Sequence, residues 1–380
     1  MTYSAMDRAN SRIDGVLSRH KPQKRFKPLR VLIVAPSLDI LGGQAIQAAR
    51  LLDRLRPEPS IEVDFLPVNP RLPGPLRTLQ RIKYVRTVVT SLFYWVSLLA
   101  RVHKYDVIHI FSASYYSFLL APTPAILVAK LYGKKIVLNY RSGEAADHLR
   151  RWPRTAIPIM RLADEIAVPS GYLVDVFAQF ELVSRAIPNF VDTKQFLFRE
   201  RKRLRPVFFS NRNFEPLYNV GCVIRAFHII QQRLPDAKLI LAGDGSQRGE
   251  LEALTRKLEL RDVHFIGRVA PLQMHSLYDS ADVYLNSPDI DNMPGSIIEA
   301  FASGLPVVTT NAGGIRYIVE NGSSGLVVNC GDYRSLAENA LGLFEDRLLF
   351  EKLTAGAQQE CKKYEWAAVR NDWLELYFGN

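Results

Sequence analysis

Short, largely apolar runs alternate with helical patterns along most of this chain, and this alternation restricts the fold more than any other feature. Five runs occupy residues 29–36, 61–68, 106–111, 135–140 and 163–170, and six more occupy residues 206–211, 237–243, 262–267, 281–286, 305–310 and 325–329. Such runs are typical of strands buried on both faces, and helices between consecutive strands imply right-handed crossovers. The sequence therefore predicts parallel sheets covered by helices on both faces.

The runs fall into two groups, which are separated by the charged sequence RERKRLR at residues 199–205. We expect a basic leader without periodicity at residues 1–28, a Rossmann-like domain at 29–190, a linker with exposed charges at 191–205, and a second Rossmann-like domain at 206–365. Ligands of open α/β sheets bind at the carboxyl ends of the strands. Two such domains therefore predict a site in the cleft between their sheets.

Charge and cysteine content restrict the possible partners. The first 200 residues carry 29 Lys and Arg against 16 Asp and Glu, whereas the rest carry 20 against 22. A basic surface fits nucleic acid, anionic lipid, an acidic substrate or plain solvation, but no RNP pattern, zinc finger or recognition helix supports nucleic acid. Cys222, Cys330 and Cys361 have no CxxC or CxH spacing, and no secretory signal is evident. We therefore expect a reducing, cytoplasmic setting without disulfides or structural zinc.

Residues 76–100 form an amphipathic stretch. Basic residues come first and an aromatic face follows, in the order Arg77, Arg81, Lys83, Arg86, Phe93, Tyr94 and Trp95. The most apolar part, residues 87–100, is 14 residues long, shorter than the roughly 20 that span a bilayer, so we expect no membrane crossing. Two roles stay open: a helix packed on the sheet, or an interfacial helix in peripheral contact with anionic lipid at the inner face of the membrane.

The most informative segment begins at Asp291. Pro294 suits the first turn of a helix and Gly304 suits a left-handed stop, so these residues bracket a helix of about ten residues with Glu299 near its middle. The free amides and partial positive charge at the helix start form an anion site that suits a diphosphate. Glu299 lies one to two turns further along, where its carboxylate can accept both hydroxyls of a ribose.

This segment resembles glycosyltransferase family 4 of the GT-B fold. The family signature is an acidic residue, seven residues and a Glu, which here are Asp291 and Glu299, followed by AFASGLPVV, by Gly313-Gly314 and by NGSSGLVV. The resemblance implies that Glu299 binds the donor ribose and that Asp291 lies against the donor sugar. It also implies that the backbone between them binds the donor, and the residues concerned are Met293, Pro294, Gly295 and Ser296.

Other parts of the chain match the family in the expected order. Gly42-Gly43 resembles the N-terminal glycine loop, where backbone approaches phosphate or acceptor without a Cβ in the way. Gly243, in GDG, and Val269, in Gly267-Arg268-Val269, occupy strand ends that approach the nucleotide. Turn chemistry alone is the alternative for these glycines. The tail, residues 366–380, resembles the closing helix that crosses back to the first domain.

Two residues that the family usually supplies are missing. The phosphate clamp has an Arg and a Lys; Arg212 is present, but Leu217 or Tyr218 replaces the lysine. The family often places a His after the 135–140 strand, where this chain has Arg141, which either stands in for that His or packs between domains. We expect His109 to be a core histidine, and His148 either contacts substrate or caps a loop.

A metal is not expected. Asp289-Ile290-Asp291 spells D-x-D, but that motif holds a metal in a different, single-domain glycosyltransferase fold. No G-x-G-x-x-G follows the first strand, which argues against a nicotinamide enzyme. We expect no cofactor.

The resemblance implies a metal-independent enzyme that moves a sugar from a nucleotide diphosphate sugar to a hydroxyl of a glycan or lipid-linked acceptor. Arg212, Asp291 and Arg141 would serve catalysis, and the anomeric configuration would be retained. Polysaccharide or glycolipid biosynthesis is the expected setting. Two rivals stay open: a catalytically degenerate nucleotide-sugar-binding or scaffold protein, and a sugar-nucleotide epimerase of the same fold.

Overall fold

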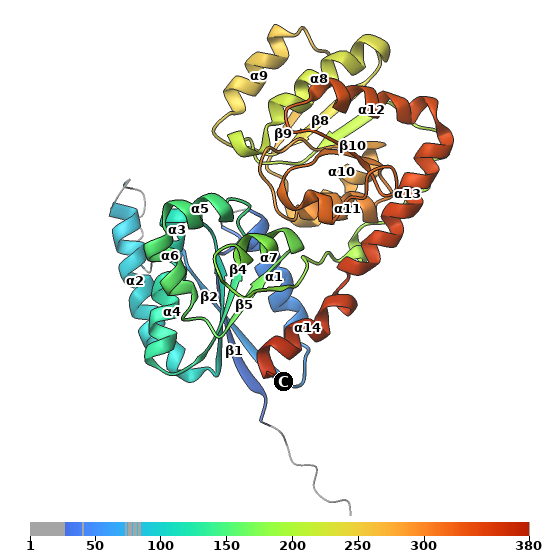
Figure 1. Ribbon diagram of the computed structural model, residues 1–380. Coiled ribbons are helices and arrows are strands. Elements are labelled where there is room, and N and C mark those ends of the chain that lie inside the picture. Colours follow the sequence, from blue (N-terminus) through green and yellow to red (C-terminus); the bar gives the residue numbers. More distant parts are fainter. Residues whose placement is uncertain are drawn as a thin grey trace, which may run out of the picture.

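Two parallel sheets of six strands each form the framework of this computed structural model (Figure 1). The structure describes residues 27–39, 42–72, 74, 78, 82 and 85–379. The strand order is β2-β1-β3-β4-β5-β6 in the N-terminal sheet and β12-β11-β10-β7-β8-β9 in the C-terminal sheet. The predicted α/β class with two facing parallel sheets is confirmed. Nearly all of the predicted leader lies outside the described residues.

The N-terminal half alternates strands and helices. Its elements are β1 (Leu29–Ala35), α1 (Gly43–Leu55), β2 (Ile61–Pro67), α2 (Val85–Arg101), β3 (Val107–Ser112), α3 (Tyr115–Leu120), α4 (Pro122–Leu131), β4 (Lys135–Tyr140), α5 (Ala145–Arg151), α6 (Pro153–Met160), β5 (Glu165–Val168), α7 (Gly171–Ala178) and β6 (Arg185–Ala186). The five predicted runs became β1 to β5. The two-residue edge strand β6 was not predicted, because it is too short to give a pattern.

The C-terminal half repeats the alternation. Its elements are β7 (Val207–Ser210), α8 (Val220–Arg233), β8 (Lys238–Ala242), α9 (Arg248–Lys257), β9 (Val263–Gly267), α10 (Met274–Ser280), β10 (Val283–Leu285), α11 (Gly295–Ala302), β11 (Val307–Thr310), β12 (Leu326–Val328), α12 (Tyr333–Glu345), α13 (Arg347–Cys361) and α14 (Trp366–Phe378). Each of the six predicted runs contains one strand.

Both faces of the N-terminal sheet are covered, as the apolar strands require. Along β1, Leu32 and Val34 face a core shared with α2 and with α4 to α7. Val31 and Ile33 face the opposite core, which α1 and α14 close. Figure 1 shows α13 running from the C-terminal half to α14, which lies against the N-terminal half. The chain therefore crosses between the two halves twice.

The two crossings lie side by side. The backbone N–H of Val191 donates to the carbonyl of Tyr364 at 2.9 Å, and the rings of Phe190 and Trp366 are 5.1 Å apart. The Tyr377 hydroxyl of α14 reaches the buried His109 at 2.7 Å. Burial lowers the pKa of His109 to about 3, with the Arg141 charge adding to the effect. The prediction of a core histidine is confirmed.

The expectation of exposed charges in the linker is wrong at Arg201. Its side chain is fully buried and lies against the equally buried Asp282, with Nε to Oδ1 at 3.2 Å. Arg199 and Arg205 bind the same carboxylate. The buried anion is what allows this arginine into the interior, because an unpaired buried charge is costly.

Helix α2 continues through a 3₁₀ turn to Lys104, which makes it longer than the 14-residue run suggested. Among the described residues it is the one helix, Val85–Lys104, long and apolar enough to cross a membrane by length and composition. The argument from length against a crossing is therefore wrong. The predicted aromatic face is also divided, because Tyr94 is buried and donates to the carbonyl of Ala121, whereas Trp95 is exposed. Arg77, Arg81 and Lys83 lie outside the described residues.

Candidate functional site

A cleft of about 370 Å³ opens where the carboxyl ends of the strands of both sheets meet. Its lining follows β1, β4 and β5 in the N-terminal half and β7 to β10 in the C-terminal half. It includes every residue that the sequence proposed for the site, namely Gly42, Gly43, Arg141, Arg212, Gly243, Val269, Asp291, Met293, Pro294, Gly295, Ser296 and Glu299. Twelve residues from distant parts of the sequence thus face one space.

Helix α11 points its first turn at this cleft. It has eight residues rather than ten, and Pro294 is its N-cap with extended backbone (φ −68°, ψ 115°), not a residue of the first turn as predicted. Gly304 ends it with φ at +70°, as expected. The amides of Gly295 and Ser296 have no earlier helical carbonyl to bind. The helix start therefore presents free donors and partial positive charge to the cleft.

The Glu299 carboxylate is almost buried and holds two partners. Arg50, on α1 of the opposite domain, donates from Nη2 to Oε1 at 2.7 Å. The buried Tyr278 donates its hydroxyl to Oε2 at 3.0 Å. The residue proposed to bind ribose is therefore fixed in position by both halves of the protein, and a ribose would have to displace at least one of these partners.

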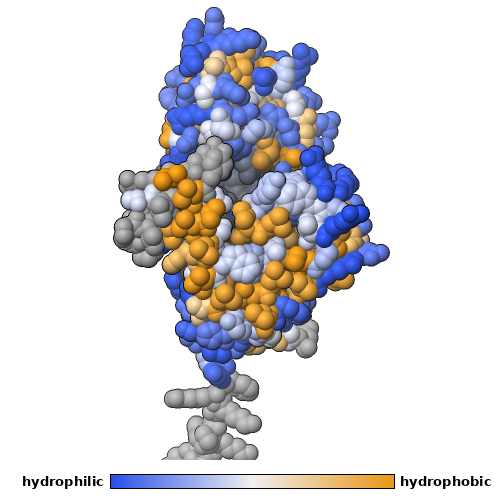
Figure 2. Space-filling model, turned by 90° about the vertical axis from the view of Figure 1, so that its left-hand side faces the viewer, coloured by the Kyte–Doolittle hydropathy of each residue, from blue (hydrophilic) through white to orange (hydrophobic). Residues whose placement is uncertain are grey.

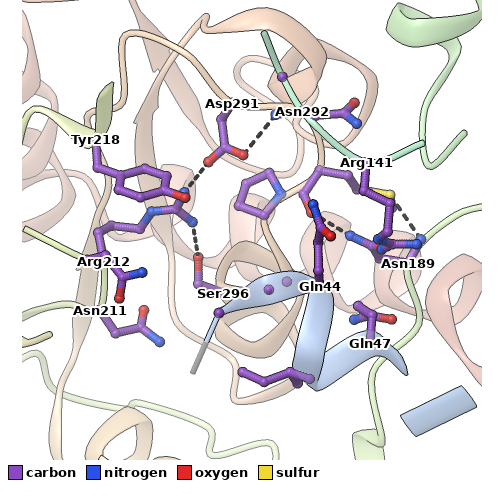
Figure 3. A pocket seen from close by; sticks show the side chains of 18 of the residues that line it. Gln44, Gln47, Arg141, Asn189, Asn211, Arg212, Tyr218, Asp291, Asn292 and Ser296 are labelled. Atoms are coloured by element: carbon purple, nitrogen blue, oxygen red, sulfur yellow. Dashed lines mark hydrogen bonds and ion pairs between the residues drawn. The ribbon is translucent and has the colours of Figure 1, made fainter. Parts of the chain in front are cut away.

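Arg212 pairs with Asp291 on the other side of the α11 start (Figure 3). Its Nη1 also donates to the Ser296 hydroxyl at 3.2 Å, and the Tyr218 ring lies 4.1 Å from its guanidinium. Burial works to lower the pKa of Arg212, but the Asp291 charge outweighs it, so the pKa is raised. Tyr218, one of the two residues that can occupy the position of the missing lysine, thus contacts the arginine without adding charge.

The loop that carries Asp291 is held closely by its neighbours. Ser170 of the N-terminal half donates to the Asn292 side chain, and Asn189 donates to the Met293 carbonyl at 2.7 Å. A Cβ on Gly314 would lie 2.0 Å from the Asn292 carbonyl oxygen, so only glycine permits this approach. The second glycine of the Gly313-Gly314 pair therefore supports the site without touching a ligand.

Arg141 lines the cleft but faces a neutral environment. Its Nη1 donates to Asn139 at 3.2 Å and its guanidinium lies 5.4 Å from the Phe111 ring. Burial lowers its pKa to about 9, and none of the ion pairs among the described residues involves it. An arginine so placed is available to an anion in the cleft.

His148, in contrast, lies buried within the N-terminal half, bound to the Tyr140 hydroxyl at 2.9 Å, and does not line the cleft.

The glycine loop leaves room. A Cβ at Gly42 or Gly43 would meet no atom within 4 Å, although both residues line the cleft.

Asp289 of the D-x-D sequence accepts two hydrogen bonds from Asn219 at 3.1 Å and does not share ligands with Asp291. Within the described ranges, no group of three His, Cys, Asp or Glu side chains is arranged to hold a metal ion.

Sequence reasoning missed the contribution of α1. Gln47 and Arg50 line the cleft, and Gln47 donates to the Phe190 carbonyl at 3.0 Å. These residues lie one and two turns beyond Gly43, on the same face of the helix. Polar side chains repeating at helical spacing after a glycine loop were the available signal.

The C-terminal half of this site carries a family relationship. Residues 193–360, which include Arg212, Asp291 and all of α11, match the family model described as glycosyl transferases group 1. This part of the chain belongs to that family. The predicted family relationship is thereby confirmed, and the group 1 domain supplies Arg212, Asp291 and Glu299.

Two curated relatives extend the comparison. The sulfoquinovosyl transferase SQD2 of Arabidopsis thaliana is 27% identical over 304 residues, which are 73% of this chain and 58% of that protein. A phosphatidyl-myo-inositol mannosyltransferase of Mycobacterium leprae is 25% identical over 234 residues, or 61% and 57% of the two chains. The matches thus span less than three fifths of these relatives' own length.

Solved structures share the architecture of the whole chain. HepE of Anabaena, crystallised with UDP and glucose, matches with a TM-score of 0.73 at 19% identity and covers 93% of this chain and 100% of that chain. The sucrose-phosphate synthase of Thermosynechococcus elongatus matches with a TM-score of 0.73 at 18% identity, over 92% and 98% of the two chains. The group 1 domain therefore sits within a complete GT-B fold.

Proposed function

We propose that this chain transfers a sugar from a nucleotide diphosphate sugar to a hydroxyl of a glycan or lipid-linked acceptor. In this proposal residues 29–190, with the tail 366–380, bind the acceptor, and residues 206–365 bind the donor. The observation that carries it is the arrangement around the start of α11. Free helical amides, the Arg212 guanidinium and the Glu299 carboxylate meet there in one interdomain cleft.

Each part of this arrangement suits one part of the donor. The helix start and Arg212 favour a diphosphate, since both present N–H donors and positive charge. Glu299, one turn further along α11, accepts from vicinal hydroxyls of a ribose. Asp291 is positioned to accept from a hydroxyl of the sugar, and it is paired with Arg212. Gly243 and Val269, at the ends of β8 and β9, flank the space left for the base.

The chemistry follows from where the charge develops. The bond between the anomeric carbon and the diphosphate oxygen breaks, and a bond to the acceptor oxygen forms on the same face of the sugar. The acceptor proton passes to the departing diphosphate, which makes a protein base unnecessary. Arg212 and the helix amides stabilise the negative charge that accumulates on the leaving group. Arg141, a half-buried arginine that has no carboxylate partner among the described residues, adds positive potential from the opposite wall.

A panel of nucleotide sugars tests this function. The full chain is incubated with UDP-, GDP- and ADP-sugars and with lipid-linked and oligosaccharide acceptors, and the release of nucleoside diphosphate is measured. We expect nucleoside diphosphate to be released from one donor class, and only when an acceptor is present. The rate of this release should fall at least a hundredfold in Arg212→Ala. Proton NMR of the product reports the anomeric configuration.

The rival binding or scaffold function predicts a different result. It rests on the absence of the clamp lysine and of the family histidine. Donor binding that survives Arg212→Ala, with no turnover on any acceptor, would favour it over transfer. Conversion of the sugar without transfer would instead favour the epimerase.

We further propose that the chain works in the cytoplasm at the inner face of the membrane. Figure 2 shows an apolar patch on the face of the N-terminal half where α2 lies in Figure 1. Exposed apolar side chains repeat at helical spacing along α2 and continue on α4: Val85, Val88, Leu92, Trp95, Val96, Leu99, Leu127 and Leu131. Arg86 and Lys104 lie at the two ends of this helix. An apolar stripe with basic ends and a Trp suits the surface of an anionic bilayer.

Two of the relatives' names support a lipid-borne acceptor for this chain. One names phosphatidyl-myo-inositol, and another, an enzyme of Campylobacter jejuni, names an undecaprenol-linked glycan. Placing the acceptor domain on the membrane would bring such an acceptor to the cleft. Tyr94 and Leu98 of α2 are buried against the rest of the N-terminal half. This packing favours a helix that lies on the bilayer over one that crosses it.

Vesicle sedimentation separates these states. We expect the full chain to pellet with vesicles containing phosphatidylglycerol but not with pure phosphatidylcholine, and to be released by alkaline carbonate. Leu92→Glu should abolish pelleting, whereas Leu348→Glu, at a 78% exposed position on α13, should not. Resistance to carbonate would mean that α2 spans the membrane, and equal pelleting of both variants would remove α2 from the proposal.

A further inference from the structure

Arg50 lies beside the start of α11, as Arg212 does. Its Nη1 is 3.9 Å from the place that a Cβ would take on Gly295, the first residue of α11, and Gln47 Nε2 is equally near. Arg212 reaches the next residue, Ser296. Two arginines from two domains therefore flank the same pair of helical amides.

The other cations of the cleft are placed differently. Among the described residues, four arginines and no lysine line the cleft. Besides Arg50 and Arg212, these are Arg141 and Arg268. Arg141 packs against the Phe111 ring and Asn139. Arg268 is 62% exposed at the far end of the cleft, near Asp244. Only Arg50 shares the start of α11 with Arg212.

The present partner of Arg50 is the group that a ribose would need. Arg50 binds Glu299 Oε1, and Tyr278 binds Oε2, so both carboxylate oxygens are occupied. A ribose hydroxyl that takes Oε1 displaces Arg50, which then needs another anion. The diphosphate, held at Gly295 and Ser296, would lie next to it. The Arg50 side chain is 17% exposed and its Nη1 already lies beside Gly295, so the new partner would be close to the present position of the guanidinium.

We infer that Arg50 is the second ligand of the donor diphosphate and takes over the task of the missing clamp lysine from the opposite domain. This inference rests on the proposed donor site. In the empty cleft Arg50 binds Glu299; in the occupied cleft it binds phosphate while Glu299 binds ribose. Because α1 belongs to the N-terminal half and α11 to the C-terminal half, the bound diphosphate then replaces the direct contact of Arg50 with Glu299 as the link between the two halves.

Calorimetry with matched ligands tests the inference. The full chain is titrated with UDP, GDP and ADP, and then the nucleoside of whichever diphosphate binds is titrated. We expect Arg50→Ala to weaken diphosphate binding about tenfold to a hundredfold, the range of a lost charge-assisted hydrogen bond. Nucleoside binding should stay the same or tighten, because Glu299 is freed. Arg50→Lys should restore part of the diphosphate affinity but not the geometry of the original contact.

Arg54→Ala is the matched control. Arg54 lies one turn further along α1 and also reaches across to the linker, where it binds Asp192 at 3.0 Å, but it does not line the cleft. We expect it to change neither affinity.

The outcomes separate the possible roles of Arg50. If Arg50→Ala tightens both the diphosphate and the nucleoside, Arg50 only blocks Glu299, and the inference is overturned. An equal loss for both ligands would mean a structural role and would overturn it as well. If the wild-type chain binds none of the three diphosphates, the proposed donor site itself fails, which a wild-type titration reports before any variant is made.

Discussion

Replacing Asp282, the residue before β10, with Asn should destabilise the C-terminal half. Asp282 and Arg201 are both fully buried and 3.2 Å apart. The variant keeps the shape of the side chain but leaves Arg201 without an anion. The five N–H groups of Arg201 retain carbonyl acceptors, including Ala281 and Ser303, so Arg201 itself loses a charge partner and not its hydrogen bonds. The Asn amide nitrogen cannot accept, so the backbone N–H and Nε of Arg205, which now donate to Asp282 Oδ2, lose an acceptor as well.

Breaking a buried pair by removing one charge costs about 3–5 kcal/mol. The contacts of Asp282 with Arg199 and Arg205 add little, because those side chains are 33% and 52% exposed and stay hydrated. We therefore expect a loss of about 3 kcal/mol in the free energy of unfolding. Glu338→Gln is the control, since its pair with Arg233 is more than half exposed on both sides and should contribute less than about 0.5 kcal/mol.

Urea denaturation followed by two signals localises the effect. Residues 206–365 contain no Trp, so tryptophan fluorescence reports the N-terminal half and α14, while circular dichroism reports all helices. We expect Asp282→Asn to shift the dichroism transition to lower urea and to separate it from the fluorescence transition. A loss below about 1 kcal/mol would refute the reasoning, because it would show that the carbonyl acceptors alone satisfy Arg201.

The dependence of this effect on pH follows from the pKa of Asp282. Burial works to raise that pKa, but the arginines, Arg205 first, outweigh it and lower it below the ordinary value of 3.8. A carboxylate with a lowered folded pKa contributes stability above its unfolded pKa and loses it as the pH falls through the folded value. The difference between wild type and Asp282→Asn should therefore be complete above about pH 5 and should shrink below about pH 4.

Three further outcomes are expected. His109 has a folded pKa of about 3 and an unfolded pKa of 6.5, so its contribution to stability is present above pH 6.5 and declines as the pH falls. Urea unfolding should show that the free energy of unfolding is about 1 kcal/mol lower at pH 5.5 than at pH 7, and this loss should be absent from His109→Gln. Gly314→Ala should weaken nucleoside diphosphate binding at least tenfold in calorimetry, because its Cβ would displace the Asn292 carbonyl, whereas Gly342→Ala, in open space on α12, should have no effect. Glu299→Gln should weaken nucleoside binding about tenfold, and an unchanged affinity would remove ribose from its role.

The strand pattern was readable because each run has a local cause. Apolar residues in β1, β4 and β10 are buried on both faces, so the signal lies within the run itself. Gly304, with its positive φ, likewise shows its role through its residue type. The ends of helix α11 were predicted to within two residues. The role of Pro294 was not predicted, because a proline suits the first turn and the N-cap almost equally and only the tertiary context decides between them.

The rest depended on partners that are distant in the sequence. Arg201 appeared as one of five basic residues in RERKRLR, and nothing in that run reveals that Asp282 would be buried beneath it. Arg50 appeared as an ordinary basic residue on an amphipathic helix, because its partner Glu299 is 249 positions away. Tyr94 and Trp95 are adjacent in sequence, but Tyr94 is buried and Trp95 is exposed. Pairings of this kind arise from the packing of whole elements.

The paired crossings at Val191 and Tyr364 determine how the two halves can move. Two connections that run together and share a hydrogen bond leave one axis about which the halves can turn, whereas two separated connections would resist rotation. The cleft begins beside the first crossing, where Asn189 lines it, so a turn about the crossings moves the cleft walls. Opening that admits a donor and closing that excludes water are then the same rotation in opposite senses, and a substitution at the Phe190 to Trp366 contact would change its rate.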